Sequence, residues 1–404
     1  MSRALPKRCV YAAPEAVVNS LDYAHRLVDE AGMDCILLRT GFNPADHDVS
    51  LGRAVALVKS LGIECWLLVG AWWGHGFDVG EEAMVGIADD MVAGGYDSHE
   101  SQWRMASPGG RADDIIEGSL RHLSRRYGPD GFCLTHARYR HAAAIAGLFE
   151  VGGDAFRALM RERGLSQQEL RRALELANVT LKTMGPGDLT SRAGIGGLAP
   201  FLDSLAETEV FTRWFSLRAA IVTRSVVRFR DAVKAELPTA RFGTNAVGPI
   251  GAFESGQEYA ALTEYCDVVQ PLLGYVYWHV LQSVSAWQRF LADRVRGISR
   301  DDALGVAAAL FGLTDVSLDL DRRDEGNDMS TAPRLVDEVV RRQLQLLEAY
   351  RDRRRLFMPV LNASHWQRAT VNAITDKIVD SGYAGVAYQG TGALADPVDG
   401  NGWN

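Results

Sequence analysis

Short apolar segments recur along the chain, and stretches with helical periodicity separate them. The apolar segments are continuous and are bounded by Gly, Pro, Asn or Asp. They occupy residues 8–13, 34–40, 64–72, 130–136, 241–247, 267–275, 356–363 and 382–389. Continuous apolar runs, rather than strict alternation, are typical of parallel strands that are covered on both faces. The pattern therefore predicts eight buried parallel strands.

The intervening segments have the period of amphipathic helices. Residues 14–32 and 50–62 each end at a glycine, which is a common helix stop. Residues 113–128 precede the fourth predicted strand, and residues 214–238 precede the fifth. Eight strands alternating with helices predict an α/β fold of the (β/α)8 TIM-barrel type. A doubly wound open sheet is the alternative, but residues 11–16 (YAAPEA) lack the phosphate-binding glycine loop usual after its first strand.

Three intervals are longer than a minimal barrel needs, and they predict helical insertions after strands three, four and six. The intervals are about residues 73–113, 141–212 and 279–355. Loops that follow the strands build the active-site face in this fold, so we expect the added mass on the functional side. The sequence contains no internal repeat and no low-complexity linker, which predicts one TIM-barrel domain over residues 1–404.

Composition narrows the function classes. The 404 residues are 47% hydrophobic and 23% charged, as is ordinary for a globular protein, and the net charge of −8 argues against a nucleic-acid surface. No apolar run approaches the roughly 20 residues that span a bilayer, and the N-terminal apolar stretch is short for a secretion signal. The five cysteines lack metal-ligand spacing, which predicts buried, reduced thiols. We therefore expect a cytoplasmic protein that binds neither nucleic acid nor membrane.

Residues just after the strands carry the chemistry of a barrel, and here they are rich in aromatic, amide and basic groups. Aromatic faces pack against the C–H faces of sugars, while amides and guanidinium groups bind hydroxyls. The pattern predicts a small carbohydrate or polyol ligand. For each tryptophan, the alternative of packing a loop against the barrel stays open. The candidate binding residues are Arg39, Trp72, Trp73, Thr135, Arg138, Tyr139, Asn245, Gln270, Tyr275, Trp278, Asn362, His365, Trp366 and Gln389.

Metal binding has weaker support in the sequence. His75, His136, His279 and His365 lie near strand ends, but no HxH or HExxH spacing accompanies them. The acidic run at residues 319–328 matches a calcium loop poorly. We expect neither a metal nor another cofactor, and the sequence does not indicate an oligomeric state.

Two stretches carry a family resemblance. Residues 102–141 contain a loop with Trp and Pro, a helix, an "RY" pair and then the strand "DGFCLTHARYRH". Residues 216–275 contain a helix and strand followed by "CDVVQPLLGY". In this order the chain resembles uncharacterised glycoside-hydrolase-like TIM barrels related to the clan A glycosidases, whose strand four reads DG-apolar-x-LDYIRYP. The resemblance implies a hydrolase that acts on a sugar or oligosaccharide.

The chain departs from that family pattern at both expected carboxylates. Thr135 stands where the pattern has Asp, His136 stands where it has Tyr, and the end of strand seven carries Asn362. Glycoside hydrolysis needs two carboxyl groups about 5 to 10 Å apart, one to donate a proton and one to attack or activate water. The acids of a hydrolase would therefore come from loops. The loop carboxylates are Asp46, Asp48, Asp78, Glu150, Asp154 and Glu254, each of which is more ordinary as a surface residue.

Three hypotheses follow from these observations. The first is a glycosidase with Glu150 as acid/base and Asp78 as its counterpart. The second is a pseudo-enzyme that binds sugar without hydrolysing it, since both strand-end carboxylates are missing. The third is an isomerase or lyase of carbohydrate metabolism, with His136 as catalytic base and Arg138 holding a carboxylate or phosphate.

Overall fold

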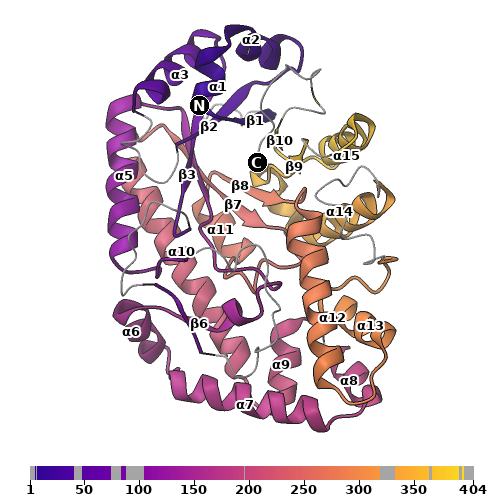
Figure 1. Cartoon of the computed structure of the whole chain (residues 1–404). Coiled ribbons are helices and arrows are strands. Elements are labelled where there is room, and N and C mark those ends of the chain that lie inside the picture. The colour runs from indigo at the N-terminus through magenta and orange to yellow at the C-terminus, as the bar shows by residue number, and fades with distance from the viewer. Residues whose placement is uncertain are drawn as a thin grey trace.

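The computed structural model contains a barrel of eight parallel strands with helices in the connections between them (Figure 1). Neighbouring strands follow the order β8–β7–β5–β3–β2–β1–β10–β9. The predicted (β/α)8 TIM barrel is therefore confirmed. The structure describes residues 5, 7–40, 48–73, 83–87, 104–194, 196–318, 333–363, 366–390 and 394.

Each of the eight predicted strands is present close to its expected position. The first and last strands along the chain, β1 and β10, pair in parallel, as a barrel requires. The strands are β1 (Arg8–Ala12), β2 (Cys35–Arg39), β3 (Glu64–Gly70), β5 (Gly131–Thr135), β7 (Arg241–Val247), β8 (Val268–Leu272), β9 (Val360–Asn362) and β10 (Val386–Gln389).

The barrel closes between β8 and β9. The backbone N–H of Met358 donates to the carbonyl of Val269 at 2.9 Å, and that of Gly274 donates to Val360 at 2.8 Å. A Cβ atom on Gly274 would lie 2.3 Å from the backbone nitrogen of Asn362. Only glycine therefore permits this close approach of the two chain segments.

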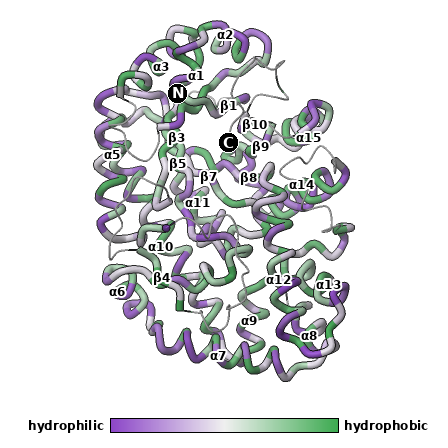
Figure 2. Tube along the Cα trace, in the orientation of Figure 1, coloured by the Kyte–Doolittle hydropathy of each residue, from purple (hydrophilic) through white to green (hydrophobic). Residues whose placement is uncertain are grey.

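Amphipathic helices cover the barrel. Their hydropathy alternates along the helical trace, as expected where one face packs on the sheet and the other meets water (Figure 2). The covering helices are α1 (Pro14–Asn19), α2 (Leu21–Asp29), α3 (Asp48–Ser60), α5 (Arg111–Tyr127), α10 (Val210–Glu236), α11 (Tyr259–Tyr265), α14 (Pro333–Leu347), η8 (Glu348–Leu356) and α15 (Arg368–Asp380).

Further elements follow strands β3, β5 and β8. In Figure 1, helices α7, α8 and α9 gather at the end of the molecule away from α1–α3. The two-residue strand β4 pairs antiparallel with β6, which joins the connection after β3 to the one after β5. These elements are β4 (Val85–Gly86), η4 (Ala146–Phe149), β6 (Glu150–Val151), α6 (Asp154–Glu162), α7 (Gln167–Thr183), α8 (Pro186–Ala193), α9 (Leu198–Ala206), the π-helix η5 (Val276–Leu281), α12 (Gln282–Arg294) and α13 (Arg300–Leu310).

Local signals in the sequence set several helix ends. The Ser166 hydroxyl accepts a hydrogen bond from the backbone N–H of Glu169 at 3.0 Å, which caps α7 as this sequence pattern predicts. Gly128 ends α5 in the left-handed conformation, with φ at 51°. All five cysteines are free and buried, as expected. Among the helices described, none combines the length and apolar character that crossing a bilayer requires.

Candidate active site at the barrel mouth

A closed network of polar side chains lies inside the barrel, below the mouth. The Tyr11 hydroxyl donates to Gln270 Oε1 at 2.9 Å, and Asn245 Nδ2 donates to the same oxygen at 3.0 Å and to Tyr11 Oη at 2.7 Å. The Cys133 thiol lies 3.1 Å from Gln270 Oε1. All four side chains are at most 4% exposed. Asn245 and Gln270, two predicted binding residues, therefore form the floor beneath the site, and Tyr11 joins them although the sequence did not suggest it.

Four predicted binding residues end their strands with side chains that face the barrel axis. Arg39, Thr135, Asn362 and Gln389 each lie two residues beyond a member of the interior cluster, and side chains two apart share a face of a strand. All four are partly exposed, unlike the interior residues. Asn362 and Gln389 are register partners on adjacent strands. The mouth therefore presents a guanidinium, a hydroxyl and two amides, and Thr135 and Asn362 stand where the resemblance places carboxylates.

His136 continues directly from Thr135 in a strained backbone conformation. Its φ of 59° lies in the left-handed region, which non-glycine residues seldom adopt. The Thr135 hydroxyl lies 3.3 Å from His136 Nδ1, and the His136 ring lies 6.4 Å from the Trp73 ring. Backbone strain of this kind is concentrated at functional sites, so the conformation of His136 is typical of an active-site loop.

The segment after β8 brings aromatic and basic groups to the same mouth. Tyr275 stacks on His279 with ring centres 5.1 Å apart, and His279 lies 5.2 Å from the ring of His141. Burial raises the pKa of Tyr275 to about 12, while the positive charges of Arg39 and Arg138 oppose this shift. Because both arginines act on one tyrosine, the ends of β2, β5 and β8 converge here. A π-helix, a form frequent at functional sites, begins at Val276.

Trp73 joins the two arginines of the loop after β5. Its indole N–H donates to the carbonyl of Arg138 at 2.8 Å. The guanidinium carbons of Arg138 and Arg140 lie 5.2 and 4.9 Å from the centre of its ring. Trp72, in contrast, donates its indole N–H to Asp113 at 2.7 Å and packs against Phe229 in the helix layer. Both tryptophans are fully buried, so neither presents a ring face to a ligand.

Glu150, the first residue of β6, forms an ion pair with Arg140 from the loop after β5. Arg140 Nε lies 3.0 Å from Oε1 and 3.1 Å from Oε2, and the two side chains are only 8% and 14% exposed. This ion pair favours the charged carboxylate. The geometry therefore suits Glu150 to the role of base or nucleophile better than to that of proton donor.

Glu254 belongs to the loop after β7, which docks on the loop after β5. The backbone N–H of Tyr139 donates to the carbonyl of Ser255 at 2.8 Å, and Gln257 Nε2 donates to the carbonyl of Ala137 at 3.1 Å. Gly256, with φ at +74°, lies so close to Tyr139 that a Cβ atom would approach its ring to 2.7 Å. Burial raises the pKa of Glu254 to about 7, against its own backbone N–H and the positive charge of Arg218. Glu254 therefore holds a proton more readily than an ordinary glutamate.

Arg218 lies behind both loops on α10. It is fully buried, its Nη1 donates to the carbonyl of Leu148 at 2.6 Å, and its guanidinium carbon lies 4.2 Å from the centre of the Tyr139 ring. Glu150 and Glu254 are the carboxyl groups whose charges act on it. The sequence contained a signal for this residue, since Arg218 follows Trp214 by four residues on the apolar stripe of its helix. One basic residue on such a stripe indicates a buried charge.

The other predicted residues are Trp278, Trp366 and several that lie outside the described residues. Trp278 is partly exposed in η5, and Trp366 is 6% exposed after β9. Asp78 and His365 lie outside the described residues, as do His75 and Asp46. Within the part of the chain that the structure describes, no three His, Cys, Asp or Glu side chains come together in a way that could hold a metal ion.

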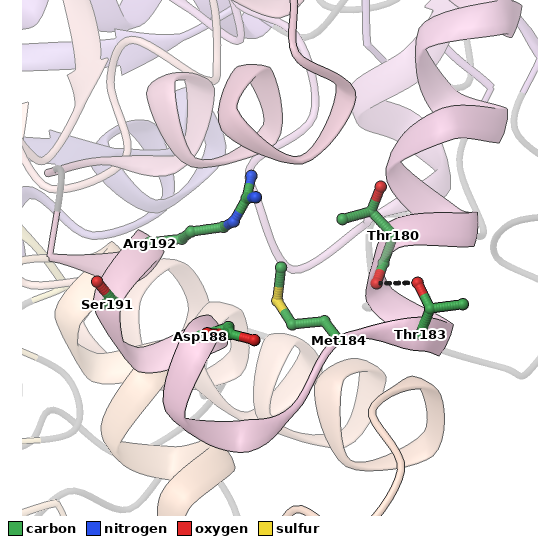
Figure 3. Close-up of a pocket in the computed structure, with 6 residues that line it drawn as sticks. All are labelled: Thr180, Thr183, Met184, Asp188, Ser191 and Arg192. Carbon is green, nitrogen blue, oxygen red and sulfur yellow. Dashed lines mark hydrogen bonds between the residues drawn. The ribbon is translucent and has the colours of Figure 1, made fainter.

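A hollow of about 290 Å³ lies between α7 and α8 in the helical region (Figure 3). Its lining consists of Thr180, Thr183, Met184, Asp188, Ser191 and Arg192. The Thr183 hydroxyl donates to the carbonyl of Thr180 at 3.2 Å, and Arg192 donates to the carbonyl of Ser204. One carboxylate with hydroxyl groups around it offers no acid–base pair, so the candidate site remains the barrel mouth.

Comparison with known proteins supports the fold. No family model and no curated protein matches the sequence. Among solved structures, the catalytic domain of a β-amylase from Paenibacillus polymyxa matches with a TM-score of 0.52 and 11% identity, covering 98% of this chain and 95% of that one. A β-galactosidase from Halorubrum lacusprofundi gives a TM-score of 0.42 with 13% identity, and the match covers 95% of this chain and 52% of that one. The likeness to the β-amylase domain shows a common barrel fold, and it shows that alone.

Proposed function

We propose that the protein is a glycoside hydrolase that acts on a sugar or oligosaccharide with acids supplied by loops. The supporting observation is that two carboxyl groups in different environments flank one buried guanidinium. Glu150 is ion-paired with Arg140, whereas burial raises the pKa of Glu254 to about 7. Pairs of carboxyl groups whose environments favour opposite protonation states are typical of glycosidase chemistry.

In this proposal Glu254 donates a proton to the leaving oxygen, and Glu150 attacks the anomeric carbon or activates water. Arg39, Arg138, Asn362 and Gln389 bind sugar hydroxyls, and the partly exposed rings of Tyr275 and Trp278 pack against the sugar faces. Asp78 stays a candidate for a further acid. We propose no metal or other cofactor for this reaction.

The experiment is a kinetic comparison of Glu254→Gln and Glu150→Gln on a panel of aryl glycosides. Loss of a proton donor is expected to lower kcat by roughly 10²- to 10⁴-fold on substrates with poor leaving groups. A good leaving group needs no proton, so Glu254→Gln should retain most activity on dinitrophenyl glycosides. Loss of the attacking or water-activating group should lower kcat with both kinds of substrate. Glu162→Gln, which alters an exposed carboxylate on α6, is the matched control. Turnover that neither Glu254→Gln nor Glu150→Gln changes would contradict the proposal.

The second candidate function is sugar binding without hydrolysis. Thr135 and Asn362 favour it, because neither side chain can act as an acid or a base at neutral pH and both face the mouth. Calorimetric binding of sugars, combined with no product after long incubation, would favour this function over hydrolysis. The isomerase or lyase alternative rests on His136, and it predicts that His136→Gln abolishes a reaction in which no glycosidic bond is hydrolysed.

A further inference from the structure

Arg218 is a buried cation with unfilled hydrogen-bonding capacity. Its Nη1 donates to Leu148, but among the described residues its Nε and Nη2 have no hydrogen-bond partner. The hydroxyl of Tyr139, whose ring lies beneath the guanidinium, is also buried without a partner there. Unsatisfied buried polar groups are rare in folded proteins, and each calls for a water, an ion or a functional explanation. Three donors without an acceptor favour a negatively charged ligand.

The charges around Arg218 also favour a negatively charged ligand. Glu150 acts on the guanidinium from β6, but both of its oxygens are within hydrogen-bond distance of Arg140. Glu254 acts on it from the loop after β7 and makes no ion pair with it in the described part of the chain. Because burial raises the pKa of Glu254 to about 7, weakly acidic solution leaves this group neutral. Arg218 and Arg140 then share the single negative charge of Glu150, and the excess of buried positive charge is costly.

We propose that Arg218 and Tyr139 form a binding site for one small monovalent anion, of the size of a halide, that balances the guanidinium when Glu254 is protonated. The ligand would accept hydrogen bonds from Arg218 Nε and Nη2 and from the Tyr139 hydroxyl. The rings of Trp214 and Phe215, whose centres lie 5.9 and 5.6 Å from the guanidinium carbon, supply an apolar wall. Sulfate or phosphate would lose more hydration than three donors restore, so the site should discriminate against them.

Binding of the anion and protonation of Glu254 are coupled in this site. An anion beside Glu254 favours the neutral carboxyl, and a neutral carboxyl leaves Arg218 free to hold the anion. Anion affinity should therefore fall as the pH rises through about 7, where Glu254 ionises and becomes the counter-ion itself. The site does not depend on the hydrolytic function proposed above, because the test below measures stability and not turnover.

The test is thermal unfolding of the full chain in sodium chloride, bromide or gluconate at equal ionic strength. At pH 6 we expect chloride and bromide to raise the Tm above the gluconate value by about 2 °C when the anion exceeds its Kd roughly tenfold. At pH 8 the difference should shrink towards zero. Sodium sulfate is excluded from protein surfaces and raises the Tm without binding a site, so its effect should be the same at pH 6 and pH 8.

Three variants locate the effect. Arg218→Met should abolish the halide response, and Tyr139→Phe, which removes one donor, should weaken it. Glu254→Gln should make the response equal at pH 6 and pH 8, because the group can no longer ionise. Arg224→Met is the matched control, since Arg224 is an exposed arginine on the same helix and should keep the full response.

Two results would overturn the site. Equal Tm values in chloride and gluconate at pH 6 would mean that water satisfies the three donors. A halide response that is undiminished in Tyr139→Phe and keeps its pH dependence in Glu254→Gln would place the anion elsewhere. These two milder variants keep the test decisive even where Arg218→Met does not fold.

Discussion

Two buried polar clusters in this protein differ in how completely their hydrogen bonds are made. In the barrel interior, Gln270 Oε1 accepts from both Tyr11 and Asn245, and all the groups are neutral. Behind the loops after β5 and β7, Arg218 is charged and keeps two nitrogens without partners among the described residues. Strands β5 and β7 contribute to both clusters. They carry Cys133 and Asn245 of the first cluster, and the loops that follow them carry Tyr139 and Glu254 beside Arg218.

The difference separates a scaffold from a place where charge can change. A satisfied neutral network gains nothing from a ligand or a proton, so it fixes the geometry of the floor. An incompletely satisfied charged cluster changes its energy whenever an ion or a proton arrives. Substitutions in the two clusters should therefore have different signatures: one independent of solution conditions, the other dependent on pH and on salt.

Gln270→Leu should cause the largest loss of stability. It removes the shared acceptor and leaves the Tyr11 hydroxyl and Asn245 amide with fewer buried partners, at about 1 to 3 kcal/mol for each unsatisfied group. We expect the free energy of unfolding to fall by about 4 kcal/mol, equally at pH 6 and pH 8. Urea denaturation at the two pH values measures this.

A triple variant provides the control for the network. Asn245 also donates to Tyr11 Oη, so Tyr11→Phe and Asn245→Leu must be combined in the Gln270→Leu background to remove both stranded donors, and the triple variant should recover part of the loss. A loss below about 1 kcal/mol in Gln270→Leu, or a strong dependence of that loss on pH, would remove the distinction between the two clusters.

Substitution of Glu254 should have the next largest effect on the free energy of unfolding. The raised pKa of Glu254 sets the direction in which this effect changes with pH. The raised pKa means that the folded protein holds the proton up to about pH 7, whereas a glutamate in the unfolded chain releases it near pH 4.5. The stabilisation is therefore fully present below about pH 4.5 and is lost as the pH rises to about 7, amounting to about 3 kcal/mol. Part of this stabilisation is already lost at pH 5, so the free energy of unfolding of Glu254→Gln relative to the parent should rise by about 2.5 kcal/mol between pH 5 and pH 8.

Taking the difference between the two proteins isolates Glu254 from other titrating groups. Burial also raises the pKa of Asp113, and ion pairs lower the pKa of Glu236 to about 2. Both contributions cancel when the parent and the variant share them. A difference that stays flat from pH 5 to pH 8 would show that Glu254 titrates as an ordinary carboxyl.

The sequence predicted the barrel well because its signals are local. Buried parallel strands need continuous apolar runs, and β1 at Arg8–Ala12 and β5 at Gly131–Thr135 lie inside the predicted segments. The same reasoning placed Arg39 and Gln389 at the mouth, since each simply ends a strand.

The pairing of charges is less accessible to sequence reasoning. Glu150 lies ten residues from Arg140, but Glu254 approaches Arg218 only because the loop after β7 docks beside α10. Tyr11 and Gln270 are 259 residues apart, so no local pattern links them. Burial then decides the chemistry, because Glu254 reads in the sequence like any loop carboxylate, and the structure leaves it 7% exposed.

The smallest predicted effect separates two tryptophans that look alike in the sequence. Trp278 is partly exposed and meets Tyr277 edge-on at 5.2 Å, whereas Trp72 is fully buried and bound to Asp113. Trp278→Ala should weaken sugar binding by about 1 kcal/mol, roughly fivefold in Kd, with little change in Tm. Trp72→Phe should lower the Tm and leave the Kd unchanged, because it affects the helix layer alone. Calorimetric titration with a bound oligosaccharide, together with thermal unfolding, measures both quantities. The reverse pattern would mean that the sugar reaches Trp72, which requires a movement of α5 or α10 that the closed packing around Asp113 opposes.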